Sequence, residues 1–215
     1  MLMRLNTTLA ILLLATACTA QTPPPAGFEA GKHYYVIDPP QPQARNDTIE
    51  VVEVFSYACI HCANAQPFVN EWQKSLPPDV TFYYLPTAFG GGAEAFARAY
   101  YTAETMGVLD RTHDALFRAF HIEQRQFRNL EDIAAFFGEL GVDKDQALAT
   151  MDSFAVNAKI ARAQQVVPRY QIEGTPTMIV AGKYRVVSTR DGFEAMLEVV
   201  DHLVDKERAE RQQGG

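Results

Sequence analysis

The cysteine pair in Cys59-Ile60-His61-Cys62 is the part of this sequence best suited to chemistry. Two thiols at this spacing can form a disulfide and exchange it with other thiols, through attack by a thiolate and a mixed disulfide. The pair follows a predicted strand and opens a predicted helix, where unpaired N–H groups and the helix dipole favour a charged sulfur. We therefore expect Cys59 to have a lowered pKa and to be the attacking sulfur. Cys62, one turn further along, is predicted to be the resolving thiol.

His61 is expected to add a hydrogen-bond donor or a positive charge to the sulfur of Cys59 through its imidazole. Two other interpretations of the cysteine pair are weaker. A zinc site would need a second ligand pair at close spacing, but the other histidines are scattered singly. A structural disulfide across so short a loop would stabilise the fold little. Redox exchange is therefore preferred, and it calls for neither a metal nor a cofactor.

Glu53 interrupts an apolar run, Val51-Val52-Glu53-Val54-Phe55, just before the cysteines. A buried carboxylate is costly unless it takes up a proton or has a partner. Our hypothesis is that Glu53 relays protons to Cys62 during exchange, directly or through water. The alternative is a surface glutamate on an edge strand, because lone glutamates are rarely buried.

The segments around the cysteines predict a strand, a helix and a second strand. Residues 48–55 and 80–85 are rich in β-branched and aromatic side chains, as strands are. Residues 63–76 have helical spacing and stop at Pro77-Pro78. Short connections make this a parallel βαβ unit, whose two strands we place at the centre of a sheet. A short strand-like run over residues 33–37 comes before it.

A long segment without strands follows, in which apolar positions recur at intervals of three and four residues. It predicts an all-helical insertion over residues 93–167. Five helices are expected there, over residues 95–106, 110–120, 129–140, 143–153 and 154–167. Its phenylalanines are interpreted as helical core, with one or two as candidates to rim a peptide groove; they are Phe117, Phe120, Phe127, Phe136 and Phe137.

Strand character returns after the insertion. Residues 177–181 and 184–188 are predicted strands joined by a two-residue turn at Gly182-Lys183. A closing helix is expected over residues 191–208, followed by a frayed tail over residues 209–215.

The chain has 215 residues, of which 47% are hydrophobic, and this excludes disorder for most of it. A net charge of −7 without a run of Lys or Arg argues against a nucleic-acid partner. Residues 1–20 have the positive start, short apolar core and small residues of an export signal, and they look like a bacterial secretory peptide. The apolar stretch is too short for a permanent membrane helix.

Cys18 adds a second interpretation of this terminus. Residues 14–18, Leu-Ala-Thr-Ala-Cys, resemble the lipobox at which bacterial lipoproteins are cleaved and acylated, although Ala15 departs from the usual leucine. Residues 21–30 are a proline-rich spacer of the kind that holds a domain off a surface. We therefore consider a lipid anchor on Cys18, with cleavage after Ala20 and loss of Cys18 as the alternative.

Three separated features give the sequence a family resemblance. The segments Glu53–Cys62 and Gly174-Thr175-Pro176-Thr177, with the helical insertion between them, resemble the DsbA family of thiol-disulfide oxidoreductases. The resemblance covers about residues 30–208 and implies an α/β protein, with a thioredoxin fold over residues 31–92 and 168–208 interrupted by the insertion. It also implies that the protein oxidises exported polypeptides and is reoxidised by a DsbB-like membrane partner.

The resemblance extends to the loop at Thr175-Pro176, which implies a cis proline beside the cysteines. There the backbone of Thr175 would pair with an extended substrate peptide. Ile60 departs from the family pattern, because the best-known branch has proline at that position. Isoleucine restores a backbone N–H and frees the φ angle, so the redox potential is left open.

The sequence therefore predicts a periplasmic enzyme that donates its Cys59–Cys62 disulfide to reduced exported polypeptides and acts as a monomer. A stabilised Cys59 thiolate would favour the reduced enzyme and so make the disulfide oxidising. One rival is an isomerase or reductase on the same fold. The other is a lipid-tethered, peptide-binding chaperone whose cysteines are incidental.

Overall fold

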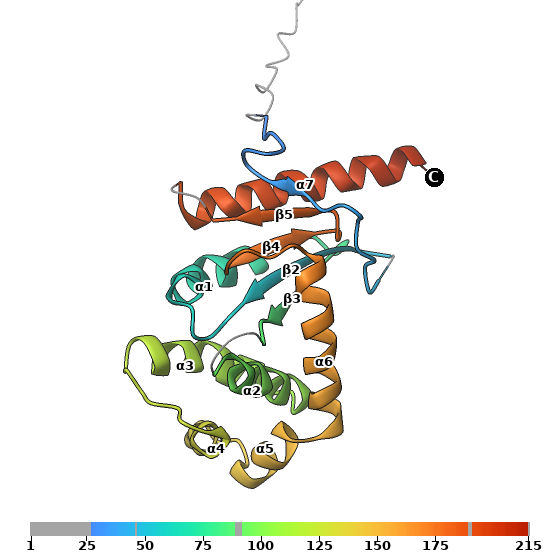
Figure 1. The fold of residues 1–215 in the computed structure, drawn as a ribbon. Helices are drawn as coiled ribbons and strands as arrows, with labels where there is room; N and C mark the ends of the chain where they lie inside the picture. The colour runs from blue at the N-terminus through green and yellow to red at the C-terminus, as the bar shows by residue number, and fades with distance from the viewer. Residues whose placement is uncertain (1–26, 46, 89–91, 189–190, 215) are drawn as a thin grey trace, which may run out of the picture.

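A mixed β-sheet with the strand order β1-β5-β4-β2-β3 organises the structure (Figure 1). The computed structural model describes residues 27–45, 47–88, 92–188 and 191–214. The predicted export signal, Cys18 and residues 21–26 of the spacer lie outside these residues. The strands are β1 (Tyr35–Val36), β2 (Ile49–Phe55), β3 (Val80–Pro86), β4 (Thr177–Val180) and β5 (Tyr184–Val187).

The predicted strand–helix–strand unit is confirmed. β2 pairs with β3 in parallel, from Ile49 opposite Val80 to Phe55 opposite Pro86, and α1 (Ile60–Gln73) connects them. Only β2 is central, because β4 pairs with its other side in the antiparallel sense. The placement of both strands at the centre was wrong for β3, which ends the sheet and packs against α2 and α6.

Five helices lie between β3 and β4 in sequence, and Figure 1 shows them gathered on one side of the sheet. This agrees with the predicted thioredoxin-like order of elements with a helical insertion, while the exact domain bounds stay a prediction. In the described part of the chain, we find no helix with the length and apolar character needed to cross a membrane. The five helices between β3 and β4 are α2 (Ala93–Thr105), α3 (Leu109–His121), α4 (Leu130–Glu139), α5 (Lys144–Met151) and α6 (Phe154–Arg169).

The pleat of β2 divides its apolar side chains between two cores. Val52 and Val54 pack with the helices of the insertion. Ile49 and Val51 pack with α1 and with α7 (Gly192–Gly214) on the other face. Alternation along a strand therefore places Glu53 on the same face as Val51, toward α1 and its cysteines.

The turn between β4 and β5 begins one residue earlier than predicted. Lys183 N donates to Val180 O at 3.0 Å, so the central residues are Ala181 and Gly182. Both have positive φ angles, 53° and 66°. Three residues, Ala181 to Lys183, separate the paired Val180 and Tyr184, so the predicted two-residue connection was one residue too short. Gly182 is needed for a second reason, because a Cβ there would lie 2.1 Å from Gln41 O.

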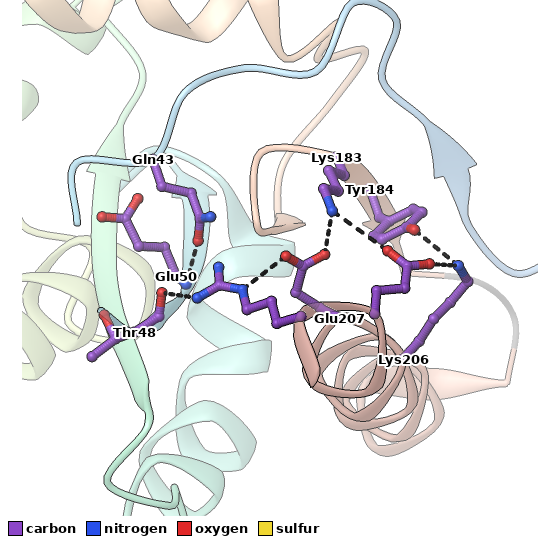
Figure 2. A network of polar contacts seen from close by, with 9 residues as sticks. Gln43, Thr48, Glu50, Lys183, Tyr184, Lys206 and Glu207 are labelled. Atoms are coloured by element: carbon purple, nitrogen blue, oxygen red, sulfur yellow. Dashed lines mark hydrogen bonds and ion pairs between the residues drawn. The ribbon is translucent and has the colours of Figure 1, made fainter. Parts of the chain in front are cut away.

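The C-terminal helix does not end at Arg208, and the predicted frayed tail is wrong, because α7 continues to Gly214. Its last turns are tied to the sheet by ion pairs and hydrogen bonds (Figure 2). Glu207, only 2% exposed, accepts from Lys183 Nζ at 2.6 Å and from Arg211 Nε at 2.9 Å. Arg211 also donates to Thr48 O at 3.0 Å. Lys183 and Thr48 are distant from α7 in sequence, so local patterning did not reveal these two contacts.

Candidate active site

The two cysteines occupy the start of α1, as predicted. Cys59 is the N-cap residue, with an extended backbone (φ −91°, ψ 116°), and it is half-buried. Cys62 lies in the first turn and is fully buried. Both are free thiols, so the structure represents the reduced protein. A reacting partner can therefore reach the first sulfur much more easily than the second.

Cys59 has a strongly lowered pKa, which falls from 9.0 to about 5. The largest cause is a hydrogen bond from the Cys62 thiol, which stabilises the thiolate, while partial burial opposes it. Hydrogen bonding with the Thr175 side chain and with the backbone N–H groups of Cys62 and His61 adds to the effect. The helix start thus contributes as expected, but the second cysteine contributes most.

His61 stabilises the sulfur through its backbone, and its side chain is exposed. The expected contribution from its imidazole stays a prediction. Ile60 is also exposed, at 48%. The two residues between the cysteines therefore present their side chains toward an approaching partner.

Cys62 has the opposite electrostatic environment. Burial raises the pKa of its thiol, the hydrogen bond to Cys59 raises it further, and the charge of Glu53 acts in the same direction. At neutral pH the pair is therefore one thiolate and one neutral thiol. This asymmetry can support attack or departure at Cys59 while the second sulfur stays protected.

Glu53 is completely buried, at 0% exposure, so the alternative of a surface glutamate on an edge strand is wrong. It lies on the interior strand β2, opposite Tyr84 of β3 and Met178 of β4. Neither carboxylate oxygen has a hydrogen-bond partner among the described residues. Burial, and then the negative charge of Cys59, raise its pKa to about 8. Glu53 is therefore predominantly protonated at neutral pH, and its role as a relay stays a hypothesis.

The loop before β4 provides the opposite wall of the site. The Thr175–Pro176 peptide bond is cis, which confirms what the family resemblance implied. Cys59 Sγ lies 3.2 Å from Thr175 O, to which it donates only in its protonated form, and Thr177 Oγ1 donates to Gly174 O at 2.8 Å. A backbone segment thus lies directly beside the reactive sulfur.

Two histidines that looked isolated in sequence meet at Tyr57, two residues before Cys59. His113 Nδ1 lies 2.6 Å from the Tyr57 hydroxyl, and His121 Nε2 donates to Tyr57 O at 2.8 Å. Burial lowers the pKa of His113 to about 3, so it stays neutral. The spacing of eight residues puts both on one face of α3, a signal that the sequence did contain. The helical insertion therefore holds the strand-to-helix turn that carries the cysteines.

Within residues 27–45, 47–88, 92–188 and 191–214, no group of three or more His, Cys, Asp or Glu side chains could hold a metal ion. A cysteine pair at a helix start, faced by a cis proline on this sheet, defines a protein that exchanges dithiols and disulfides.

Comparison with known proteins gives the family. Residues 50–201 match the DSBA-like thioredoxin domain, and the chain belongs to this family of thiol-disulfide oxidoreductases. It is 42% identical to the thiol:disulfide interchange protein DsbA of Pseudomonas syringae pv. tomato over 85% of this chain and 86% of that protein. It is 36% identical to that of Azotobacter vinelandii, over 92% of each.

Solved structures agree with the sequence comparison. The crystal structure of Pseudomonas aeruginosa DsbA superposes with a TM-score of 0.83 at 39% identity, covering 86% of this chain and 97% of that one. The oxidoreductase DsbA of Xylella fastidiosa gives a TM-score of 0.80 at 35% identity, covering 84% and 98%. The predicted fold class and the predicted reaction, dithiol–disulfide exchange, are both confirmed.

Proposed function

We propose that the protein oxidises cysteine pairs in exported polypeptides by donating a Cys59–Cys62 disulfide. The observation that carries this proposal is the asymmetry between the two sulfurs. A substrate thiolate attacks Cys59, the bond between the cysteines breaks, and Cys62 leaves with the electron pair. A second substrate thiolate then attacks the substrate sulfur of the mixed disulfide. Cys59 departs as a thiolate, for which its low pKa of about 5 suits it.

Glu53 is proposed to supply the proton that Cys62 takes up when it leaves. The raised pKa of Cys62 makes its thiolate unfavourable in the buried site, so a proton source is needed. Glu53 is buried, interacts electrostatically with Cys62, and carries a proton at neutral pH because its pKa is about 8. The transfer is direct or through one water molecule.

The direction of net electron flow follows from the same asymmetry. Stabilising the Cys59 thiolate stabilises the reduced protein, which makes the disulfide a better oxidant. Return to the disulfide form is proposed to use a DsbB-like membrane protein. An isomerase or reductase on the same fold is the alternative, and it would require the pair to be kept reduced.

Titration of the Cys59 thiolate tests this proposal. Its ultraviolet absorbance in the reduced protein is expected to have a midpoint near pH 5, and equilibration with glutathione is expected to show an oxidising potential. Cys62→Ala removes the largest stabilising hydrogen bond and should raise the midpoint, whereas Cys62→Ser keeps a donor and should raise it less. A midpoint near 9, as for an ordinary cysteine, would contradict the oxidant role.

We further propose that the protein works in the periplasm as a monomer, anchored by lipid on Cys18. The lipobox-like residues 14–18 and the proline-rich spacer support the anchor. Cys18→Ser is expected to move the protein from the membrane fraction to the soluble periplasmic fraction of fractionated cells. Cys59→Ser is the matched control and should leave the distribution unchanged. An unchanged distribution of the Cys18 variant would argue for cleavage after Ala20.

A further inference from the structure

A pocket of about 350 Å³ lies between α1 and α3, next to the reactive cysteine. Its volume is in the lower part of the range typical of binding pockets. Ile60, which follows Cys59, forms part of its lining together with Pro67 of α1. Phe117 and Ile122 line it from α3 and the end of that helix. We call this site the α1–α3 pocket.

Apolar side chains at this pocket are exposed to an unusual degree. Ile60 is 48% exposed and Ile122 is 76% exposed. They are two of only five large hydrophobic side chains that are exposed in the described part of the chain. Exposed apolar residues that occur singly need no explanation, but two beside one pocket and next to a reacting atom point to an interaction site.

A buried amide side chain with an unpaired oxygen lies at the pocket. Gln66 is buried and lines the pocket, and its Oε1 has no hydrogen-bond partner among the described residues. Its Nε2 donates to Asn70 Oδ1 at 2.9 Å and to the Tyr84 hydroxyl at 2.7 Å, which fixes the side chain. An extended polypeptide presents apolar side chains along its length, so it matches the exposed Ile60 and Ile122 beside the pocket.

The pocket is held rigidly against the cysteine segment. His121 lines it and donates to Tyr57 O at 2.8 Å, which connects α3 to the turn before Cys59. Thr175 O lies 3.2 Å from the Cys59 sulfur, while Ile60 continues from that cysteine into the pocket lining. Thr175 O and the pocket lining therefore both border Cys59, the residue at which the substrate cysteine reacts.

We propose that the α1–α3 pocket receives an apolar side chain of the substrate polypeptide, close in sequence to the cysteine that reacts with Cys59. The inference rests on the proposed function, because a substrate thiol must reach that sulfur. The inference adds a substrate preference to that function. Substrate cysteines with apolar neighbours are oxidised faster than those with small polar neighbours.

The test uses the oxidised protein and two reduced peptides, each with two cysteines. In one peptide leucine flanks both cysteines, and in the other serine does. The rate constant for reduction of the protein disulfide is expected to be about tenfold or more higher with the leucine peptide, the effect of burying one apolar group. Ile122→Glu and the uncharged Ile122→Asn should both bring this ratio close to one. Ile122→Leu should preserve it.

Phe154→Glu is the matched control, because Phe154 is 88% exposed and lies outside the pocket, at the start of α6. It should retain the preference for leucine. A ratio that stays high in both polar Ile122 variants would overturn the inference, as would equal rates for the two peptides with the unaltered protein. Failure of the unaltered protein to exchange even with dithiothreitol would instead overturn the proposed function, and the inference with it.

Discussion

Replacing Cys59 by serine is expected to lower the rate of substrate oxidation by at least about 1,000-fold, the scale at which removing a nucleophile acts. A hydroxyl remains protonated at neutral pH, so it neither attacks a sulfur nor leaves from one. The surroundings that lower the pKa of the Cys59 thiol to about 5 do not ionise a serine hydroxyl at neutral pH. The measurement is the rate at which a reduced two-cysteine peptide is oxidised, with dithiothreitol as a second reductant.

Cys62→Ser provides the matched comparison. It keeps the half-buried Cys59 thiol but removes the fully buried sulfur that resolves the mixed disulfide. This variant should therefore accumulate a covalent complex with a substrate disulfide, visible by non-reducing electrophoresis and reversed by dithiothreitol. Full activity of a Cys59→Ser, Cys62→Ser double variant in cells would favour the rival in which the cysteines are incidental to a chaperone.

Glu53→Gln is expected to stabilise the reduced protein at high pH and to have little effect at low pH. The pKa of Glu53 is raised from 4.5 to about 8, so the unfolded chain releases this proton before the folded protein does. Its contribution to stability is thus present below pH 4.5, declines as the pH rises toward 8, and is lost above that. At high pH, where Glu53 is ionised in both states, its burial lowers the free energy of unfolding by about 5 kcal/mol, at 1.36 kcal/mol per pKa unit.

Urea unfolding of both proteins at several pH values between 4 and 9 measures this difference. Glu198→Gln changes an exposed glutamate of α7 and serves as the control, with an expected effect within about 0.5 kcal/mol. A constant difference between Glu53→Gln and the unaltered protein across the range would show that the carboxyl titrates normally. Separately, the pH dependence of exchange should change in Glu53→Gln, and an unchanged profile would remove the proposed relay.

Several features of the site were predictable from the sequence because they depend on local order along the chain. A strand that ends at Phe55, shortly before Cys59, with helical residues after that cysteine, places its sulfur at a helix start. The parallel pairing of β2 and β3 followed from the short connections around α1. The cis state of Pro176 followed from family resemblance, since no local pattern encodes it.

Other features depend on partners that only folding brings together. The tail of α7 is helical because Glu207 meets Lys183 and Arg211 meets Thr48 O. Patterning within the helix gave no sign of these contacts, and the tail was wrongly expected to fray. The edge position of β3 was missed for a similar reason, because the partner on the other side of β2 comes from beyond the helical insertion.

The sequence by itself determined the reactive group, its place at the start of a helix and the class of reaction, since these follow from residue type and neighbours along the chain. The tertiary structure decided how unequal the two sulfurs are. That inequality arises from the burial of Cys62, its hydrogen bond to Cys59 and the contact with Thr175. It also decided that Glu53 is buried with no hydrogen-bond partner for its carboxyl oxygens among the residues that the structure describes. Desolvation depends on everything packed around a group, and no local sequence pattern records it.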